Sequence, residues 1–153
     1  MDKKNNKKMA EPLAAKHRAR KRIIQALYQT HFNHMAATEV IEQFLEEQDF
    51  AKVDVDFFRE VMLGVEKNKT ELQEMIDPYL GREKVSLGAI EYAALLLATY
   101  ELVNHIETPF KVIINEAILM TQAFGGEGSH TFVNGVLYKI AQQTRATEMG
   151  EAP

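Results

Sequence analysis

Segment 88–105, GAIEYAALLLATYELVNH, constrains this chain most, because apolar residues occupy nearly every side of a helical projection of it. A helix of this kind is stable in water only when neighbouring elements cover it. The flanking segments carry apolar residues at helical spacing and show few strand signals. We therefore predict an all-α fold in which amphipathic helices surround segment 88–105.

Helix boundaries follow from periodicity and from start and stop residues. Helices are predicted over 14–32, 39–48, 54–77, 88–105, 109–124 and 130–142, with a turn at 79–87. The predicted start signals are Thr38, Asp54 or Asp56, Thr108 with Pro109, and Ser129. Gly125 is expected to close a helix in the left-handed conformation. Gly64 costs up to ~1 kcal/mol relative to alanine inside a helix, so it indicates a close helix contact.

The length of 153 residues suits one domain. We predict a disordered basic arm over 1–13, one helical domain over 14–143 and a flexible tail over 144–153. The absence of cysteine excludes disulfides and thiolate zinc sites and fits a reducing cytoplasm. No apolar run approaches the ~20 residues that cross a bilayer. We therefore predict a cytoplasmic protein without a membrane partner.

Charge is distributed unevenly along the chain. Residues 1–22 hold nine of the 18 Lys and Arg residues but two of the 22 acidic ones, which leaves nine basic and twenty acidic residues elsewhere. A basic end on an acidic body indicates an anionic partner, most simply nucleic acid. A solubilising tail is the alternative.

The stretch FGGEGSHTFVNG, at 124–135, resembles a phosphate-binding loop only superficially. It follows a helical segment instead of a strand, and no lysine followed by Ser or Thr comes after the glycines. We interpret it as a turn between two helices, whose free N–H groups could attract a backbone phosphate near Ser129 and His130. His31 and His34 lack a third metal ligand, and no nucleophile with a base can be assembled. The sequence therefore predicts no enzyme, no metal and no cofactor.

Four stretches carry a family resemblance: ARKRIIQALYQ, DVDFFREVMLGV, INEAI and FGGEGSHTFVNGVL. From Lys16 to Ala141 the chain resembles the NusB family of bacterial transcription antitermination factors. The resemblance implies six to seven helices in two small bundles packed across each other. It also implies binding of the boxA segment of nascent ribosomal RNA, together with the small-subunit ribosomal protein NusE. Other Nus factors and RNA polymerase would be further partners, and a homodimer stays open.

The family's RNA-binding residues can be carried over one by one. They fall on Lys16, His17, Arg18, Arg20, Arg22, Gln25, Tyr28, Glu91, Ser129, His130, Phe132 and Asn134. Cations neutralise phosphates, aromatic rings stack on bases, and amides hydrogen-bond to base edges. Core packing is the alternative for Tyr28 and Phe132, and an internal cap or pair is the alternative for Glu91.

Some positions depart from the family pattern. His17, Thr131, Tyr92 and Leu96 stand where basic residues are often found, and Gly128 replaces a frequent acidic residue. Fewer cations should weaken phosphate contacts and flatten the salt dependence, unless lysines of 1–15 compensate. The alternative function is therefore an interaction module with a degraded RNA face. The resemblance places NusE on residues within 79–105 and 109–120.

Overall fold

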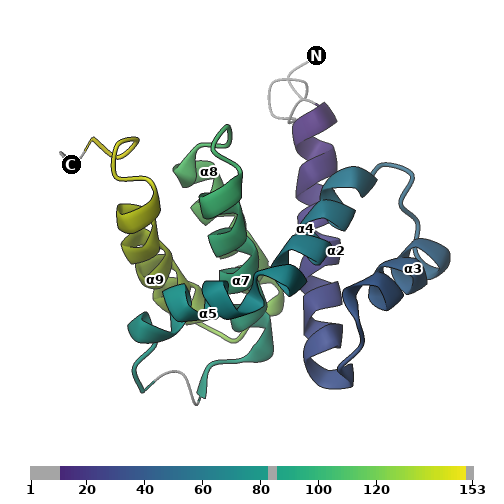
Figure 1. Cartoon of the computed structure of the whole chain (residues 1–153), viewed down its shortest axis with the longest axis horizontal. Helices are drawn as coiled ribbons and strands as arrows, with labels where there is room; N and C mark the ends of the chain where they lie inside the picture. The colour runs from purple at the N-terminus through teal and green to yellow at the C-terminus, as the bar shows by residue number, and fades with distance from the viewer. Residues whose placement is uncertain (1–10, 83–85, 151–153) are drawn as a thin grey trace. The chain divides into compact units, whose positions relative to one another are not determined.

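The computed structural model describes residues 11–82 and 86–150, and all regular structure within these ranges is helical (Figure 1). The helices are α2 (Glu11–Asn33), α3 (Ala37–Glu47), α4 (Val55–Lys67), α5 (Lys69–Ile76), the 3-10 helix η1 (Asp77–Tyr79), α7 (Ala89–Asn104), α8 (Phe110–Phe124) and α9 (Ser129–Thr144). They form two compact units, Met1–Leu63 and Gly64–Pro153. The prediction of an all-α fold with two helical bundles is confirmed. None of the described helices is long and apolar enough to span a membrane.

The first unit is built on α2, which packs against α3 and the start of α4 (Figure 1). The apolar positions of α2 repeat at helical spacing, and Ile23, Ile24 and Leu27 are buried. The ring of Phe58 completes this core, with its centroid 6.0 Å from that of Phe44 and 5.0 Å from that of Phe50.

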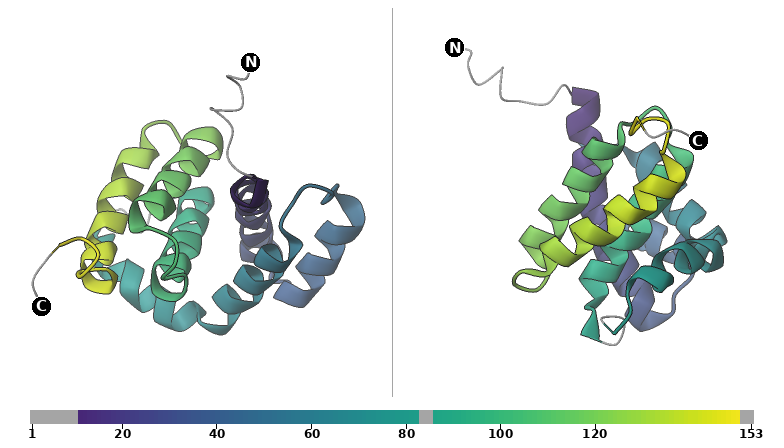
Figure 2. Two further views of the ribbon diagram at one scale, coloured as in Figure 1. Left: turned by 90° about the horizontal axis from the view of Figure 1, so that it is seen from above. Right: turned by 90° about the vertical axis from the view of Figure 1, so that its left-hand side faces the viewer.

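In the second unit α7 is the central helix, with α8 and α9 side by side and both packed against it (Figures 1 and 2). Every residue from Ala93 to Leu102 is buried, which confirms the prediction for segment 88–105. Gly64 is the first residue of this unit. A Cβ atom at Gly64 would lie 2.3 Å from the hydroxyl oxygen of Tyr100, so the predicted close contact is also confirmed.

The predicted helix 54–77 is interrupted. Asn68 leaves the helical conformation between α4 and α5, and its side-chain amide donates a 2.9 Å hydrogen bond to the Gly64 carbonyl. The Asn68 backbone N–H also donates to the Gly64 carbonyl, at 3.0 Å, so side chain and backbone share one acceptor at the point where the backbone angles change. Periodicity missed the break because the apolar spacing continues through it.

Several predicted start signals are also displaced. Thr38 lies inside α3, and the Glu39 carboxylate instead accepts the Ala36 N–H at 3.2 Å. Asp54 does cap α4, since its carboxylate accepts the Phe57 N–H at 3.0 Å. Ser129 is the first residue of α9 instead of the residue before it.

The ends of the predicted domain differ from the sequence prediction. Residues 11–13 belong to α2, so the helix begins inside the segment predicted to be a disordered arm; residues 1–10 and 151–153 lie outside the described ranges. Arg145, predicted to lie in a flexible tail, is 4% exposed. It donates to the carbonyls of Leu102 at 2.8 Å, His105 at 2.8 Å and Thr108 at 3.0 Å.

The partner of Arg145 connects this turn to a second helix. Glu148 forms an ion pair with Arg145, and its carboxylate accepts the Phe110 N–H at 2.8 Å. Residues 145–148 therefore satisfy carbonyls at the end of α7 and the first N–H of α8, groups that a helix leaves unpaired. Glu148 takes the role that the sequence predicts for Thr108.

Candidate nucleic-acid interface

The predicted RNA-binding residues fall into two groups, one in each unit. In the first unit they all lie on α2: Lys16, His17, Arg18, Arg20, Arg22, Gln25 and Tyr28. In the second unit they lie at the start of α7 and of α9: Glu91, Ser129, His130, Phe132 and Asn134. We describe the two groups separately.

Arg20 is 4% exposed and therefore differs from the surface cation that the sequence predicts. Its guanidinium carbon lies 5.2 Å from the centroid of the Phe57 ring. The Lys16 ammonium lies 5.6 Å from the same ring. A buried guanidinium on an aromatic face stabilises packing, here between α2 and α4. Arg20 thus has a structural position, and a contact between its side chain and RNA would require it to leave this packing.

Arg18 and Arg22 keep a more exposed position but are held in place. Arg18 donates to the Lys52 carbonyl at 2.9 Å and lies 3.6 Å from the Glu11 carboxylate. Arg22 donates to the Asp49 carbonyl at 2.9 Å. Each arginine has five N–H donors, so bonds to backbone carbonyls leave further donors and the full positive charge. These two side chains fix the connector between α3 and α4 and still present cations on α2.

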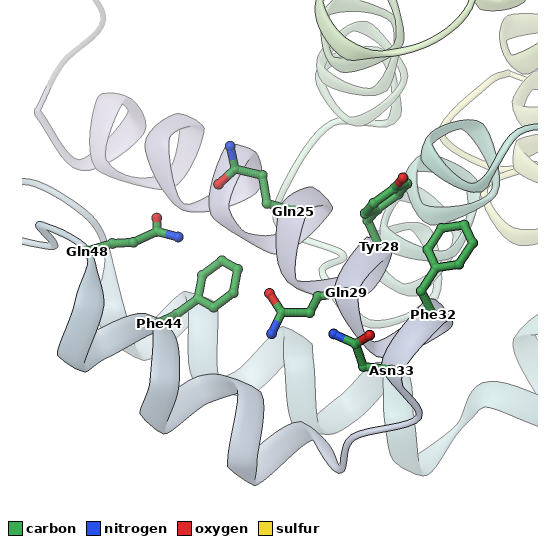
Figure 3. Close-up of a pocket in the computed structure, with 7 residues that line it drawn as sticks. All are labelled: Gln25, Tyr28, Gln29, Phe32, Asn33, Phe44 and Gln48. Carbon is green, nitrogen blue, oxygen red and sulfur yellow. The ribbon is translucent and has the colours of Figure 1, made fainter.

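Tyr28 and Gln25 are exposed, as RNA contacts must be. The Tyr28 side chain is 42% exposed, so the core-packing alternative does not hold for this residue. Its ring centroid lies 4.8 Å from that of Phe32, one turn further along α2. Figure 3 shows both rings beside Gln25 on the same side of α2. Sequence reasoning missed Phe32, although it follows Tyr28 at the spacing of one helical turn.

In the second unit, Glu91 joins the start of α7 to the loop before α9. Its carboxylate oxygen Oε2 accepts the Gly126 N–H at 2.6 Å and the Ser129 hydroxyl at 2.6 Å. The Ser129 hydroxyl is also 2.8 Å from the Gly126 carbonyl. Glu91 is 5% exposed. Its contacts are those of an internal cap, which was the alternative to RNA contact for this residue. We call these contacts the Glu91 clasp.

Two glycines leave room for the Glu91 clasp. A Cβ atom at Gly88 would lie 2.3 Å from Glu91 Oε1, and one at Gly125 would lie 2.6 Å from Glu91 Oε2 and 2.8 Å from the Thr121 carbonyl oxygen. Gly125 has φ −93° and ψ −174°, so the predicted left-handed closing residue is wrong. Glycine is needed at position 125 because a side chain there would collide with the Glu91 carboxylate. The sequence alone does not show that Glu91 lies beside this residue.

The hydrogen bonds of the clasp favour the charged form of Glu91. Burial raises the pKa of this carboxyl, but the bonds from the Ser129 hydroxyl, the Gly126 N–H and its own backbone N–H outweigh burial. The net effect is a pKa below the ordinary value for glutamate. The carboxylate therefore already accepts the Gly126 N–H and the Ser129 hydroxyl in front of α9, where the sequence predicts that a phosphate is attracted.

Phe132 lines a hollow beside the clasp, together with Ser129, Gly126 and Ser86. Phe132 and His130 are half-buried, whereas Val133 is fully buried and occupies the core position for which Phe132 was the alternative. Asn134 lines a different hollow, with Asn115 and Tyr138 between α8 and α9. Within this unit the structure thus brings Glu91, Ser129 and Phe132 together and leaves Asn134 apart.

Three departures from the family pattern, at Leu96, Tyr92 and Gly128, have individual structural explanations. Leu96 is buried, and the Tyr92 hydroxyl donates to the Asp77 carboxylate at 2.8 Å. Burial, the Asp77 bond and the Asp77 charge raise the pKa of Tyr92. Gly128 has φ +79°, a left-handed conformation that favours glycine. Thr131 is exposed and remains a surface position without a cation. Within 11–82 and 86–150, no three His, Asp or Glu side chains are grouped to hold a metal ion.

Comparison with known proteins decides the family. The family model described as the NusB family matches residues 17–142. The chain belongs to the NusB family. Among curated relatives, the transcription antitermination protein NusB of Sodalis glossinidius is 45% identical over 86% of this chain and 95% of its own length. The protein of the same name from Neisseria meningitidis serogroup B is 44% identical over 88% of this chain and 95% of its own length.

A solved structure agrees with this membership. NusB of T. maritima covers 94% of this chain and 99% of its own length, with a TM-score of 0.76 and 27% sequence identity. The resemblance seen in the sequence is confirmed, and its expected range of Lys16 to Ala141 nearly equals the matched range. The NusB family consists of transcription antitermination factors and is not an enzyme family.

Proposed function

We propose that this chain is a non-catalytic antitermination factor that binds boxA-type single-stranded RNA of nascent ribosomal transcripts, in complex with NusE. The exposed side of α2 is the observation that carries the proposal. Arg18 and Arg22 provide held cations, and Tyr28 and Gln25 provide an exposed ring and a free amide further along the helix. The cations can bind the phosphates of a single-stranded RNA. The ring can stack on its bases, and the amide can hydrogen-bond to their edges.

The Glu91 clasp supports a second part of the same interface. A carboxylate repels phosphates, so Glu91 is a positioning residue in this proposal and not an RNA contact. It holds Ser129 and the adjoining turn and thereby places the half-buried Phe132 ring at the edge of the hollow. Phe132 is the proposed stacking residue here, with His130 and Asn134 as further polar contacts.

The proposed NusE surface lies at the junction of α7 and α8, where Val103 and Val112 fall in the two ranges that the resemblance indicates and Ile106 lies in the connector between those ranges. Val103, Ile106 and Val112 are 41%, 66% and 42% exposed. Exposed apolar residues that are close together in the chain are typical of a protein contact. Ile106→Glu should therefore abolish NusE binding and leave the fold intact, which size-exclusion chromatography and circular dichroism can measure.

Fluorescence anisotropy with a short boxA-like RNA and a scrambled RNA tests the RNA proposal, with and without NusE and across a salt series. We expect selective binding that NusE tightens. Arg18→Ala should weaken binding to all sequences and lower the salt slope by about one. Arg59→Ala, which removes an exposed arginine from α4, is the matched control and should change neither quantity.

The interaction module is the alternative outcome of the same measurement. A protein that binds NusE but no RNA, even with NusE present, would have this function instead. The exposed position of Tyr28 favours RNA binding, because a module without an RNA face has no need for that ring in water.

A further inference from the structure

A groove between α2 and α3 lies next to the proposed RNA face, and the proposed function does not assign it a ligand. The groove has a volume of about 540 Å³, and its lining includes Gln25, Tyr28, Gln29, Phe32, Asn33 and Gln48 (Figure 3). We call it the α2–α3 groove. Tyr28 and Gln25 connect it to the proposed RNA face, and Gln29 ends the stretch ARKRIIQALYQ that carries the family resemblance. Phe32, Asn33 and Gln48 come from neither the sequence prediction nor the family resemblance.

The rim of the groove is aromatic and exposed. Phe32 is 55% exposed and Tyr28 is 42% exposed, and their ring centroids are 4.8 Å apart. His31 contacts the edge of Phe32 at the same centroid distance of 4.8 Å. The planes of the Tyr28 and Phe32 rings are inclined at 59°, so each ring offers its own exposed face on which an unpaired base can stack.

The groove also contains amides that are available for a ligand. In the described part of the chain, the side-chain amides of Gln25, Asn33 and Gln48 make no hydrogen bond to protein. Gln29 is oriented by a 2.9 Å bond from its nitrogen to the Gln43 side-chain oxygen. A side-chain amide offers donors beside an acceptor, the combination that recognises base edges.

Charge indicates how a strand would lie. Lys21 precedes Gln25 by one helical turn, and Arg18 precedes Lys21, so cations lead along α2 toward the groove. The α3 side instead ends in the exposed acidic pair Glu46 and Glu47. Phosphates would therefore lie along α2, and only an uncharged base would approach α3.

We propose that the α2–α3 groove binds an unpaired nucleobase of the RNA strand directly next to the boxA segment. The base stacks on the exposed Phe32 ring, next to the base that Tyr28 takes, and the amides of Asn33 and Gln48 hydrogen-bond to its edge. This inference rests on the proposed function and adds a subsite to it. RNA is favoured over a protein segment because the groove continues from the cations of α2.

Binding of extended RNAs to the full chain with NusE tests the subsite. The probes are the core boxA-like RNA, the same RNA with three added nucleotides at either end, and abasic versions that keep the added phosphates but lack bases. We expect one natural extension to bind about five- to tenfold more tightly than its abasic version. Gln48→Ala should reduce this ratio toward one without changing the affinity for the core RNA. Phe32→Ala should also reduce the ratio toward one, and the ratio is compared within each variant because Phe32 contacts Tyr28.

Matched controls and contrary outcomes are available within the chain. Leu13→Ala removes a similarly exposed apolar side chain from α2, and Gln142→Ala removes an exposed amide from α9. Neither should change the ratio. Equal binding of natural and abasic extensions, with intact core binding, would overturn the subsite alone. Loss of NusE binding in Phe32→Ala without RNA would assign the groove to protein instead, and failure of every RNA to bind would overturn the proposed function as well.

Discussion

Substituting alanine at two helical glycines should have opposite effects on stability. Alanine favours a helix by up to ~1 kcal/mol relative to glycine. At Gly135 a Cβ atom would meet nothing within 4 Å, so Gly135→Ala should stabilise the protein by roughly 0.5–1 kcal/mol. At Gly64 the new methyl group would lie 2.3 Å from the Tyr100 hydroxyl oxygen and 2.4 Å from its ring carbons, and Tyr100 is only 6% exposed.

Overpacking of this kind typically costs about 1–3 kcal/mol, which exceeds the gain in helix propensity. We therefore expect Gly64→Ala to be less stable than the wild type by up to about 2 kcal/mol. Urea unfolding followed by circular dichroism, with the slope compared between variants, measures both changes. Equal stability of Gly64→Ala and Gly135→Ala would show that the contact with Tyr100 carries no steric cost and would refute this prediction.

Three further predictions concern the Glu91 clasp and the C-terminal turn. Gly125→Ala should weaken boxA RNA binding several-fold, whereas Gly126→Ala, whose Cβ would lie 3.5 Å from the Glu91 carboxylate, should bind nearly as the wild type does. Because the folded-state pKa of Glu91 is lowered, its stabilising effect is complete above the unfolded value of about 4.3 and is lost as pH falls through the folded value. Urea unfolding should therefore show that Glu91→Gln loses less stability than the wild type between about pH 6 and pH 3. Equal losses in the two proteins would contradict a lowered pKa for Glu91. Arg145→Ala should lower the free energy of unfolding by roughly 2–4 kcal/mol, because it leaves buried carbonyls unpaired, while the exposed control Arg59→Ala should change it by less than about 0.5 kcal/mol.

The sequence indicates which residues belong to the candidate site, but it does not indicate which of them are exposed and which of them hold the structure together. The family resemblance suggests Tyr28 and Ser129 as site residues. Tyr28 is exposed, and Ser129 lines the hollow beside the Glu91 clasp. Arg20 carries the same charge as Arg18, yet it is buried against Phe57. Helical periodicity places Arg20 one turn before the buried Ile23 and Ile24, on the packing side of the helix, but it does not identify Phe57, 37 positions away on another helix, as the ring that covers it.

The sequence by itself determined the helical class, the central position of segment 88–105, the approximate extent of most helices and the family. The helical class, the central segment and the helix extents depend on local spacing and composition, because a helix buries whichever side is apolar. The family instead follows from the resemblance of particular stretches of the sequence. Only the tertiary structure decided which cations are exposed, why Gly125 must lack a side chain, and that Arg145 is part of the packed domain. Each of those outcomes depends on contacts between segments far apart in the chain, which exist only when the helices have packed.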